Sequence, residues 1–130
     1  MSSLTRLAAI GLITFFSASA ALADAAALKM LDVDKNGAID VKEAKAGGAK
    51  VFAKINPDKD GTVDAKELGD RVDAAGIKAA DPDSDGTLDE VEYGALIEEK
   101  FKAANPDGDE TIEEDELVTP EGKALLILIQ

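Results

Sequence analysis

The chain has 130 residues, with 27 Asp plus Glu against 14 Lys plus Arg, so its formal net charge is −13. Such an acidic chain lacks the basic surface that nucleic-acid binding requires. It contains no His and no Cys, which removes imidazole and thiolate as catalytic groups and as ligands for soft metals. We therefore expect a small, largely aliphatic core in one domain, and a protein that is not an enzyme.

Residues 1–23 differ in kind from the rest of the chain. Arg6 is their only charged residue, an apolar run covers 7–16, and small residues follow it. The Ala-Leu-Ala at 21–23 matches the site that signal peptidase cuts. We expect a secretory signal peptide at 1–23, a metal-binding domain at 24–130, and a periplasmic protein with no membrane attachment after cleavage. A membrane anchor is the alternative, although the uncharged stretch is at the lower limit of spanning length.

Four twelve-residue segments align with one another: residues 32–43, 56–67, 81–92 and 105–116, numbered here as loops 1 to 4. Loops 1 and 3 carry the full EF-hand signature, Asp-x-Asp-x-Asn/Asp-Gly with Glu at position 12. In such a loop, oxygen atoms from positions 1, 3, 5, 7, 9 and 12 surround one hard cation. The alternative is a solvated acidic face, but that would not repeat acids in register. The repeat therefore predicts metal binding.

The predicted ligands are the residues at these six positions of each loop, with the backbone carbonyl serving at position 7. They are Asp32, Asp34, Asn36, Ala38, Asp40 and Glu43; Asn56, Asp58, Asp60, Thr62, Asp64 and Glu67; Asp81, Asp83, Asp85, Thr87, Asp89 and Glu92; and Asn105, Asp107, Asp109, Thr111, Glu113 and Glu116. We expect loop 3 to bind most strongly, because it has Asp at positions 1, 3, 5 and 9. Loop 4 is expected to bind most weakly, because Glu110 replaces the glycine of position 6 at a cost of about 1 to 2 kcal/mol.

Only 12 or 13 residues separate successive loops, enough for a single helix of about 18 Å. An ordinary EF-hand pair needs an exiting helix, a linker and an entering helix in this interval. We therefore predict an all-α fold: a compact three-helix bundle with four EF-hand loops joined by single shared helices. In this up-down-up arrangement, loops 1 and 3 lie at one end and loops 2 and 4 at the other.

Apolar periodicity supports the three spacer helices to different degrees. The third spacer has a clear apolar face: Tyr93, Leu96, Ile97, Phe101 and Ala104. The second has a weaker one, with Leu68, Val72, Ala75 and Ala79, and Gly47 and Gly48 weaken the first. We expect segments 25–31 and 120–130 to complete the core, the apolar tail being alternatively a partner-binding element. The aliphatic residues at loop position 8 predict a short β-bridge between paired loops: Ile39, Val63, Leu88 and Ile112.

Proline follows the first ligand in three loops, at Pro57, Pro82 and Pro106, while loop 1 has Val33 there. With the short spacers, the signal peptide and the Ala-Asn-Pro-Asp start of loop 4, this makes the chain resemble the lanmodulin family. The resemblance implies a periplasmic protein that binds lanthanide(III) ions in preference to Ca²⁺ and becomes ordered on binding. It also implies a partner connected with lanthanide-dependent methanol oxidation in methylotrophic bacteria, either an enzyme or a transporter component.

Two other binding functions remain open. An extracytoplasmic Ca²⁺-binding protein would use the same oxygen ligands, so competition between the two ions must decide. A calmodulin-like adaptor would need a Met-rich groove, and Met30 is the single Met of residues 24–130.

Overall fold

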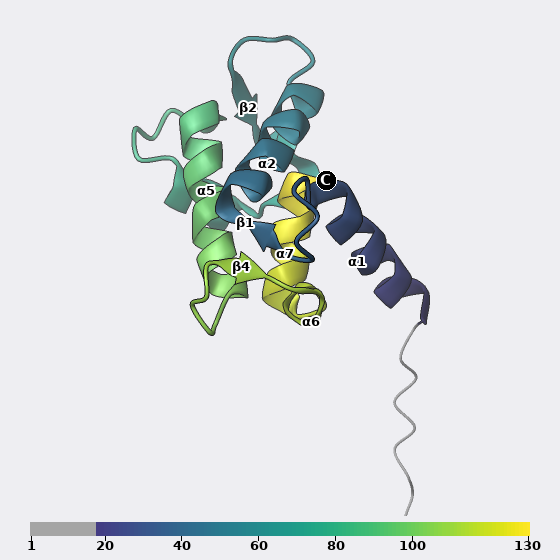
Figure 1. Ribbon diagram of the computed structural model, residues 1–130. Coiled ribbons are helices and arrows are strands. Elements are labelled where there is room, and N and C mark those ends of the chain that lie inside the picture. The colour runs from purple at the N-terminus through teal and green to yellow at the C-terminus, as the bar shows by residue number, and fades with distance from the viewer. Residues whose placement is uncertain (1–17) are drawn as a thin grey trace, which may run out of the picture.

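The computed structural model describes residues 18–130 (Figure 1). Its elements are α1 (Ala18–Leu31), β1 (Ile39–Asp40), α2 (Val41–Ile55), β2 (Thr62–Asp64), α3 (Ala65–Leu68), the 3-10 helix η1 (Gly69–Arg71), α4 (Ala74–Ala80), β3 (Thr87–Asp89), α5 (Glu90–Ala104), β4 (Thr111–Ile112), α6 (Glu114–Leu117) and α7 (Pro120–Ile129). The expected helical character is confirmed. Most of the predicted signal peptide, residues 1–17, lies outside the described residues, and α1 crosses the predicted cleavage point. Within the described part of the chain, no helix combines the length and hydropathy needed to cross a bilayer.

The loops themselves start the helices that follow them. At the end of loops 1, 2 and 3, the Asp of position 9 accepts a hydrogen bond from the backbone N–H of the Glu at position 12. That Glu side chain accepts in return from the position 9 amide. This reciprocal capping box satisfies two amides that the first helical turn leaves unpaired. The pattern Asp-x-x-Glu thus fixes where α2, α3 and α5 begin.

Helices α2, α5 and α7 pack against one another in all three pairs and form the centre of the core. The apolar face predicted for the third spacer is buried as expected. Gly47 and Gly48, which the sequence pattern treats as weak points of α2, lie buried where α2 meets its neighbours. A Cβ on Gly47 would lie 2.6 Å from the Ile129 carbonyl oxygen, and one on Gly48 would collide with the side chain of Ile97. These glycines allow the close approach of the helices.

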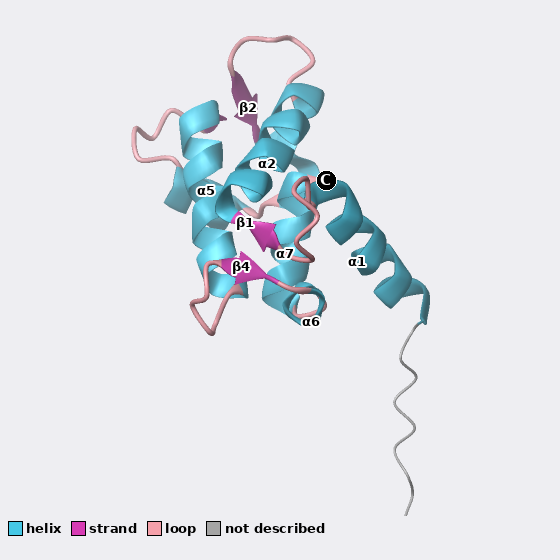
Figure 2. Ribbon diagram, in the orientation of Figure 1, coloured by secondary structure: helices cyan, strands magenta, loops and turns pink. Residues whose placement is uncertain are grey.

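The loops pair differently from the sequence-based prediction. Strand β1 of loop 1 pairs with β4 of loop 4, and β2 of loop 2 pairs with β3 of loop 3, both antiparallel. In Figure 1, β2 lies at the upper end of α2, whereas β1 and β4 lie together at the lower end; Figure 2 shows how short these strands are beside the helices. The expected placement of loops 1 and 3 at one end and of loops 2 and 4 at the other is therefore wrong. The short β-bridge itself is confirmed, because Ile39 pairs with Ile112 and Val63 pairs with Leu88. All four side chains are fully buried.

The pairing differs because the second spacer is not one helix. Helix α3 ends at Gly69, which has φ +56° and ψ −132°, a conformation that non-glycine residues avoid. The 3-10 helix η1 follows, and Asp73 then starts α4 by accepting a hydrogen bond from the Gly76 amide at 2.7 Å. The chain reverses within 13 residues and brings loop 3 back beside loop 2. The predicted helix with Val72, Ala75 and Ala79 on one face is wrong, since Ala75 and Ala79 are exposed.

Candidate metal centre

Each loop reverses direction through two residues with positive φ, at positions 4 and 6. Position 6 has φ +90°, +87° and +81° at Gly37, Gly61 and Gly86, and +73° at Glu110. Position 4, which the sequence analysis did not consider, is also left-handed: Lys35, Lys59 and Ser84 lie between +55° and +59°, and Gly108 is at +69°. Every loop therefore contains one glycine and one other residue in this region. In loops 1 to 3 the glycine is at position 6, whereas in loop 4 it is at position 4. The strain expected for Glu110 at position 6 is therefore partly offset, because loop 4 has no strained residue at position 4.

In loop 1 the ligand carboxylates are held by backbone amides. Asp32 accepts from the amides of Asn36 at 3.0 Å and Gly37 at 2.9 Å. Glu43 is buried and accepts from the amides of Val33 at 2.7 Å and Asp34 at 3.2 Å. Oxygen atoms of Asp32, Asp34 and Glu43 lie within 4.8 Å of one another. The last ligand thus already faces the first two.

Loop 3 brings together a different trio, Asp81, Asp83 and Asp85, again within 4.8 Å. Asp81 is buried and accepts from the Gly86 amide at 2.9 Å. Asp85 accepts from both the amide and the hydroxyl of Thr87, each at 2.8 Å. These bonds orient the first and third carboxylates toward the centre of the loop. Glu92 does not belong to this trio, and its carboxylate accepts a hydrogen bond from the Asp89 amide at 2.8 Å.

Loop 4 gathers Asp107, Asp109 and Glu113 within 4.8 Å. Glu113 stands at position 9, where the other loops have Asp, and its longer side chain reaches the Thr111 hydroxyl at 3.4 Å. The loop expected to be weakest therefore forms a carboxylate cluster. Glu116 stays outside it and accepts from the Glu113 amide at 3.1 Å.

Loop 2 is not among the three acidic groups found in the described residues. Its Asp60 is oriented by the amide and hydroxyl of Thr62, as in loops 3 and 4. Its first ligand is the neutral Asn56, which is only 6% exposed and whose side-chain oxygen has no hydrogen-bond partner. A buried amide oxygen without a partner is costly, and a cation in the loop would satisfy it. Loop 2 therefore has fewer converging carboxylates but keeps an oxygen available for an ion.

The threonine hydroxyls at position 7 form bonds that were not predicted, because that position was assigned only a backbone carbonyl. Thr62, Thr87 and Thr111 each donate to the Asp two residues earlier. Loop 1 has Ala38 there, and no such hydroxyl. The recurring pattern Asp-x-Thr at positions 5 and 7 was visible in the sequence and could have identified this bond.

The clustered carboxylates perturb one another. Desolvation raises the pKa of Asp34, and the neighbouring charges of Glu43 and Asp32 keep it above its ordinary value. Desolvation acts the same way on Asp32, but the Gly37 and Asn36 amides outweigh it and lower its pKa. In loop 3 the hydrogen bond shared with Asp81 raises the pKa of Asp83. In loops 1 and 3 the pKa of the first carboxylate is therefore lowered and that of the second is raised, as expected where negative charges converge.

A family model described as EF hand matches residues 24–45. The match covers the second half of α1, loop 1 and the beginning of α2. No curated protein matches the chain. The EF-hand match and the three carboxylate clusters together favour the binding of metal ions, with Ca²⁺ as the ion that EF-hand loops ordinarily take.

Proposed function

We propose that the four loops bind trivalent lanthanide ions in preference to Ca²⁺, and that ion binding orders the chain. The observation that carries this proposal is the convergence of Asp81, Asp83 and Asp85 within 4.8 Å. Within residues 24–130 no Lys or Arg forms an ion pair with any of them. A hard cation of high charge is the species that such a site accommodates best.

Ion charge provides the discrimination between lanthanides and Ca²⁺, since both prefer oxygen ligands and have similar sizes. At about 2.5 Å and an effective dielectric constant of 20, each carboxylate gains roughly 7 kcal/mol more from a third positive charge. Dehydration of the trivalent ion opposes this gain. Loop 3 offers five carboxylates at ligand positions, and the other loops offer four each. The proposal therefore places the strongest lanthanide preference at loop 3.

A Ca²⁺-binding protein is the second candidate, and the EF-hand match at residues 24–45 is the observation that favours it. Under either candidate the protein binds ions and is not an enzyme. The signal peptide predicted at 1–23 supports a periplasmic role in lanthanide uptake or trafficking, with an enzyme or transporter component as recipient. Mass spectrometry of the exported protein would test the location, because cleavage after residue 23 would leave Asp24 as its first residue.

Circular dichroism during parallel titrations with La³⁺ and Ca²⁺ tests the preference. The net charge of −13 opposes compaction of the ion-free chain. We expect a large gain in helix signal at low La³⁺ concentrations, and the same gain only at much higher Ca²⁺ concentrations. Equal folding by both ions at the same concentration would leave the Ca²⁺ function standing instead.

A further inference from the structure

A shallow groove of about 370 Å³ lies where α1, α2 and the end of α7 meet. Four apolar and two basic side chains line it: Met30, Leu31, Val51, Ile129, Lys50 and Lys54. Leu31, Val51 and Ile129 are buried and belong to the core, whereas Met30 is 70% exposed. Methionine is flexible and adapts to varied apolar partners. The groove thus combines one exposed apolar side chain, that of Met30, with the two exposed ammonium groups of Lys50 and Lys54.

The charge of α2 contrasts with that of the remaining chain. Residues 41–55 contain four Lys and one Glu and so have a net charge of +3. Since the whole chain has a net charge of −13, the residues outside α2 together carry −16. The four lysines are exposed, while the single acid, Glu43, is buried in loop 1. The outer face of α2 is therefore a basic strip on an acidic protein.

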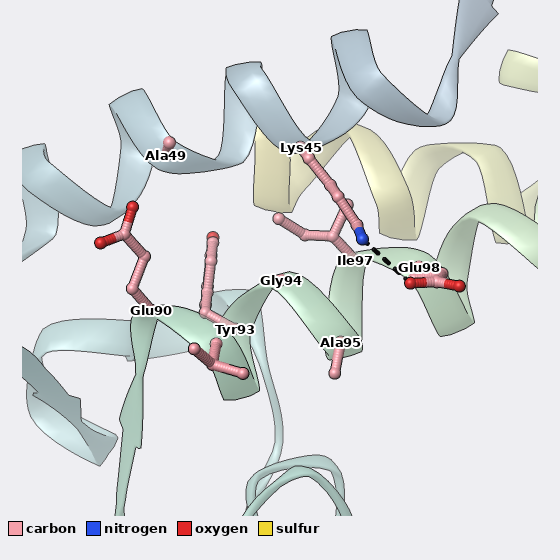
Figure 3. Close-up of a pocket in the computed structure, with 9 residues that line it drawn as sticks. Lys45, Ala49, Glu90, Tyr93, Gly94, Ala95, Ile97 and Glu98 are labelled. Carbon is pink, nitrogen blue, oxygen red and sulfur yellow. Dashed lines mark hydrogen bonds and ion pairs between the residues drawn. The ribbon is translucent and has the colours of Figure 1, made fainter.

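Three of these lysines, Lys42, Lys50 and Lys54, form no ion pair within the described residues, and the last two line the groove. Lys45 is paired with Glu98 of α5 at 3.0 Å (Figure 3), and Glu98 also pairs with Lys102 at 3.5 Å. Lys50 and Lys54 form no ion pair with any residue of 24–130. Their charges are therefore available to a ligand at the groove.

We propose that the groove between α1, α2 and α7 binds an acidic peptide segment of a partner protein. A large apolar side chain of the segment lies against the exposed Met30, and its carboxylates pair with Lys50 and Lys54. A membrane surface fits less well, because the exposed residues of α2 between the lysines are Ala46, Ala49 and Ala53. Interfacial helices instead carry large apolar side chains that enter the lipid.

Ion binding would control this interaction, and that part rests on the proposed function. At a net charge of −13 the protein repels an acidic segment over long range. Four trivalent ions would add +12 and offset most of this negative charge. We therefore expect docking to strengthen when the loops are loaded, so that the partner distinguishes the loaded from the empty protein.

The test uses a fluorescein-labelled peptide in which a Leu-Phe pair is flanked by glutamates, with binding measured by fluorescence anisotropy. Ion occupancy is measured separately, with the protein loaded with either La³⁺ or Ca²⁺. We expect Lys50→Glu/Lys54→Glu to weaken peptide binding roughly tenfold or more, and Met30→Ser to weaken it as well. The control Lys78→Glu/Lys123→Glu makes the same charge change at exposed positions on α4 and α7, and its binding is expected to stay within about twofold.

Three results would overturn the proposal. Equal loss in the two double variants would show a dependence on net charge alone. Tighter binding to phosphatidylglycerol vesicles than to the peptide would identify a membrane surface. Absence of peptide binding by fully loaded protein would exclude the docking site while leaving ion binding intact. If only the lanthanide preference were wrong, the ion titration would show it. Peptide binding to the groove could then still be measured with the Ca²⁺-loaded protein.

Discussion

The hydroxyl of Tyr93 donates a hydrogen bond to the backbone carbonyl of Leu128 at 2.7 Å, in a buried environment. The last carbonyls of α7 lack partners within the helix, and the guanidinium of Arg71 binds the neighbouring carbonyl of Ile127. Tyr93 directly follows Glu92 of loop 3, and Arg71 lies between loops 2 and 3. The end of α7 is therefore held by the part of the chain that forms the loop 2 and 3 pair.

Replacing Tyr93 with Phe removes this hydrogen bond and keeps the ring, which lies 5.6 Å from Phe52 between centroids. The Leu128 carbonyl is then buried without a partner, so we expect the free energy of unfolding to fall by about 1 to 3 kcal/mol. Urea denaturation of the ion-loaded variant measures the loss. An unchanged midpoint and slope would show that the bond contributes nothing to stability.

The same tyrosine predicts a pH dependence. Burial raises the pKa of Tyr93 to about 12 from 10.0, although the nearby charge of Arg71 acts against it. The folded protein holds the phenolic proton more tightly, so its stability is unaffected below pH 10 and falls as the pH rises from 10 toward 12. Tyr93 is the only tyrosine in the chain, and the ultraviolet absorbance of the phenolate follows it directly. Ionisation near 10 in the folded protein would contradict the buried position.

Replacing either of two glycines with open surroundings by alanine is expected to change the stability of the protein, in opposite directions at the two positions. A Cβ on Gly69 or on Gly94 would meet nothing within 4 Å, so both replacements by Ala test backbone conformation alone. Gly69→Ala forces a non-glycine residue into the mirror-β region at φ +56° and ψ −132° and is expected to cost about 1 to 3 kcal/mol. Gly94→Ala lies within α5 and is expected to gain up to about 1 kcal/mol. Thermal unfolding of the two loaded variants compares them, and a gain for Gly69→Ala would refute the helix break.

In loop 4, two substitutions of Glu110 distinguish the effect of backbone strain on ion binding from the effect of charge. Glu110→Gly relieves the left-handed position at φ +73° and removes one charge, whereas Glu110→Gln removes the charge alone. We expect Glu110→Gly to bind an ion in loop 4 more tightly than Glu110→Gln by roughly fivefold to thirtyfold, equivalent to about 1 to 2 kcal/mol. Calorimetric titration of both variants measures this ratio, and equal affinities would show that position 6 does not limit the site.

Much of the local structure follows from the sequence because the repeat specifies it. The Asp-x-x-Glu at the end of loops 1 to 3 predicts both a ligand pair and a helix start, and the aliphatic position 8 predicts the bridge. The apolar spacing of Tyr93, Leu96 and Ile97 likewise predicts the buried face of α5. In these cases neighbouring residues alone determine the outcome.

The pairing of the loops could not be obtained in this way. It depends on Gly69 and Asp73, which divide the second spacer, and the spacer's length alone favoured one continuous helix. The roles of Gly47 and Gly48 also depend on what packs against them, namely Ile129 and Ile97. Glu67, Glu92 and Glu116 are predicted as ligands from their position; like Glu43 they accept from the position 9 amide, but unlike Glu43 they are not part of the three acidic clusters.

Competition between terbium and calcium, observed through Tyr93, tests lanthanide preference most directly. Tyr93 adjoins the last ligand of loop 3, so excitation of the tyrosine reports terbium bound there. We expect terbium luminescence to develop with the first equivalents and to persist in a large molar excess of Ca²⁺. Displacement of terbium by Ca²⁺ at comparable concentrations would contradict the preference and leave an ordinary Ca²⁺-binding protein.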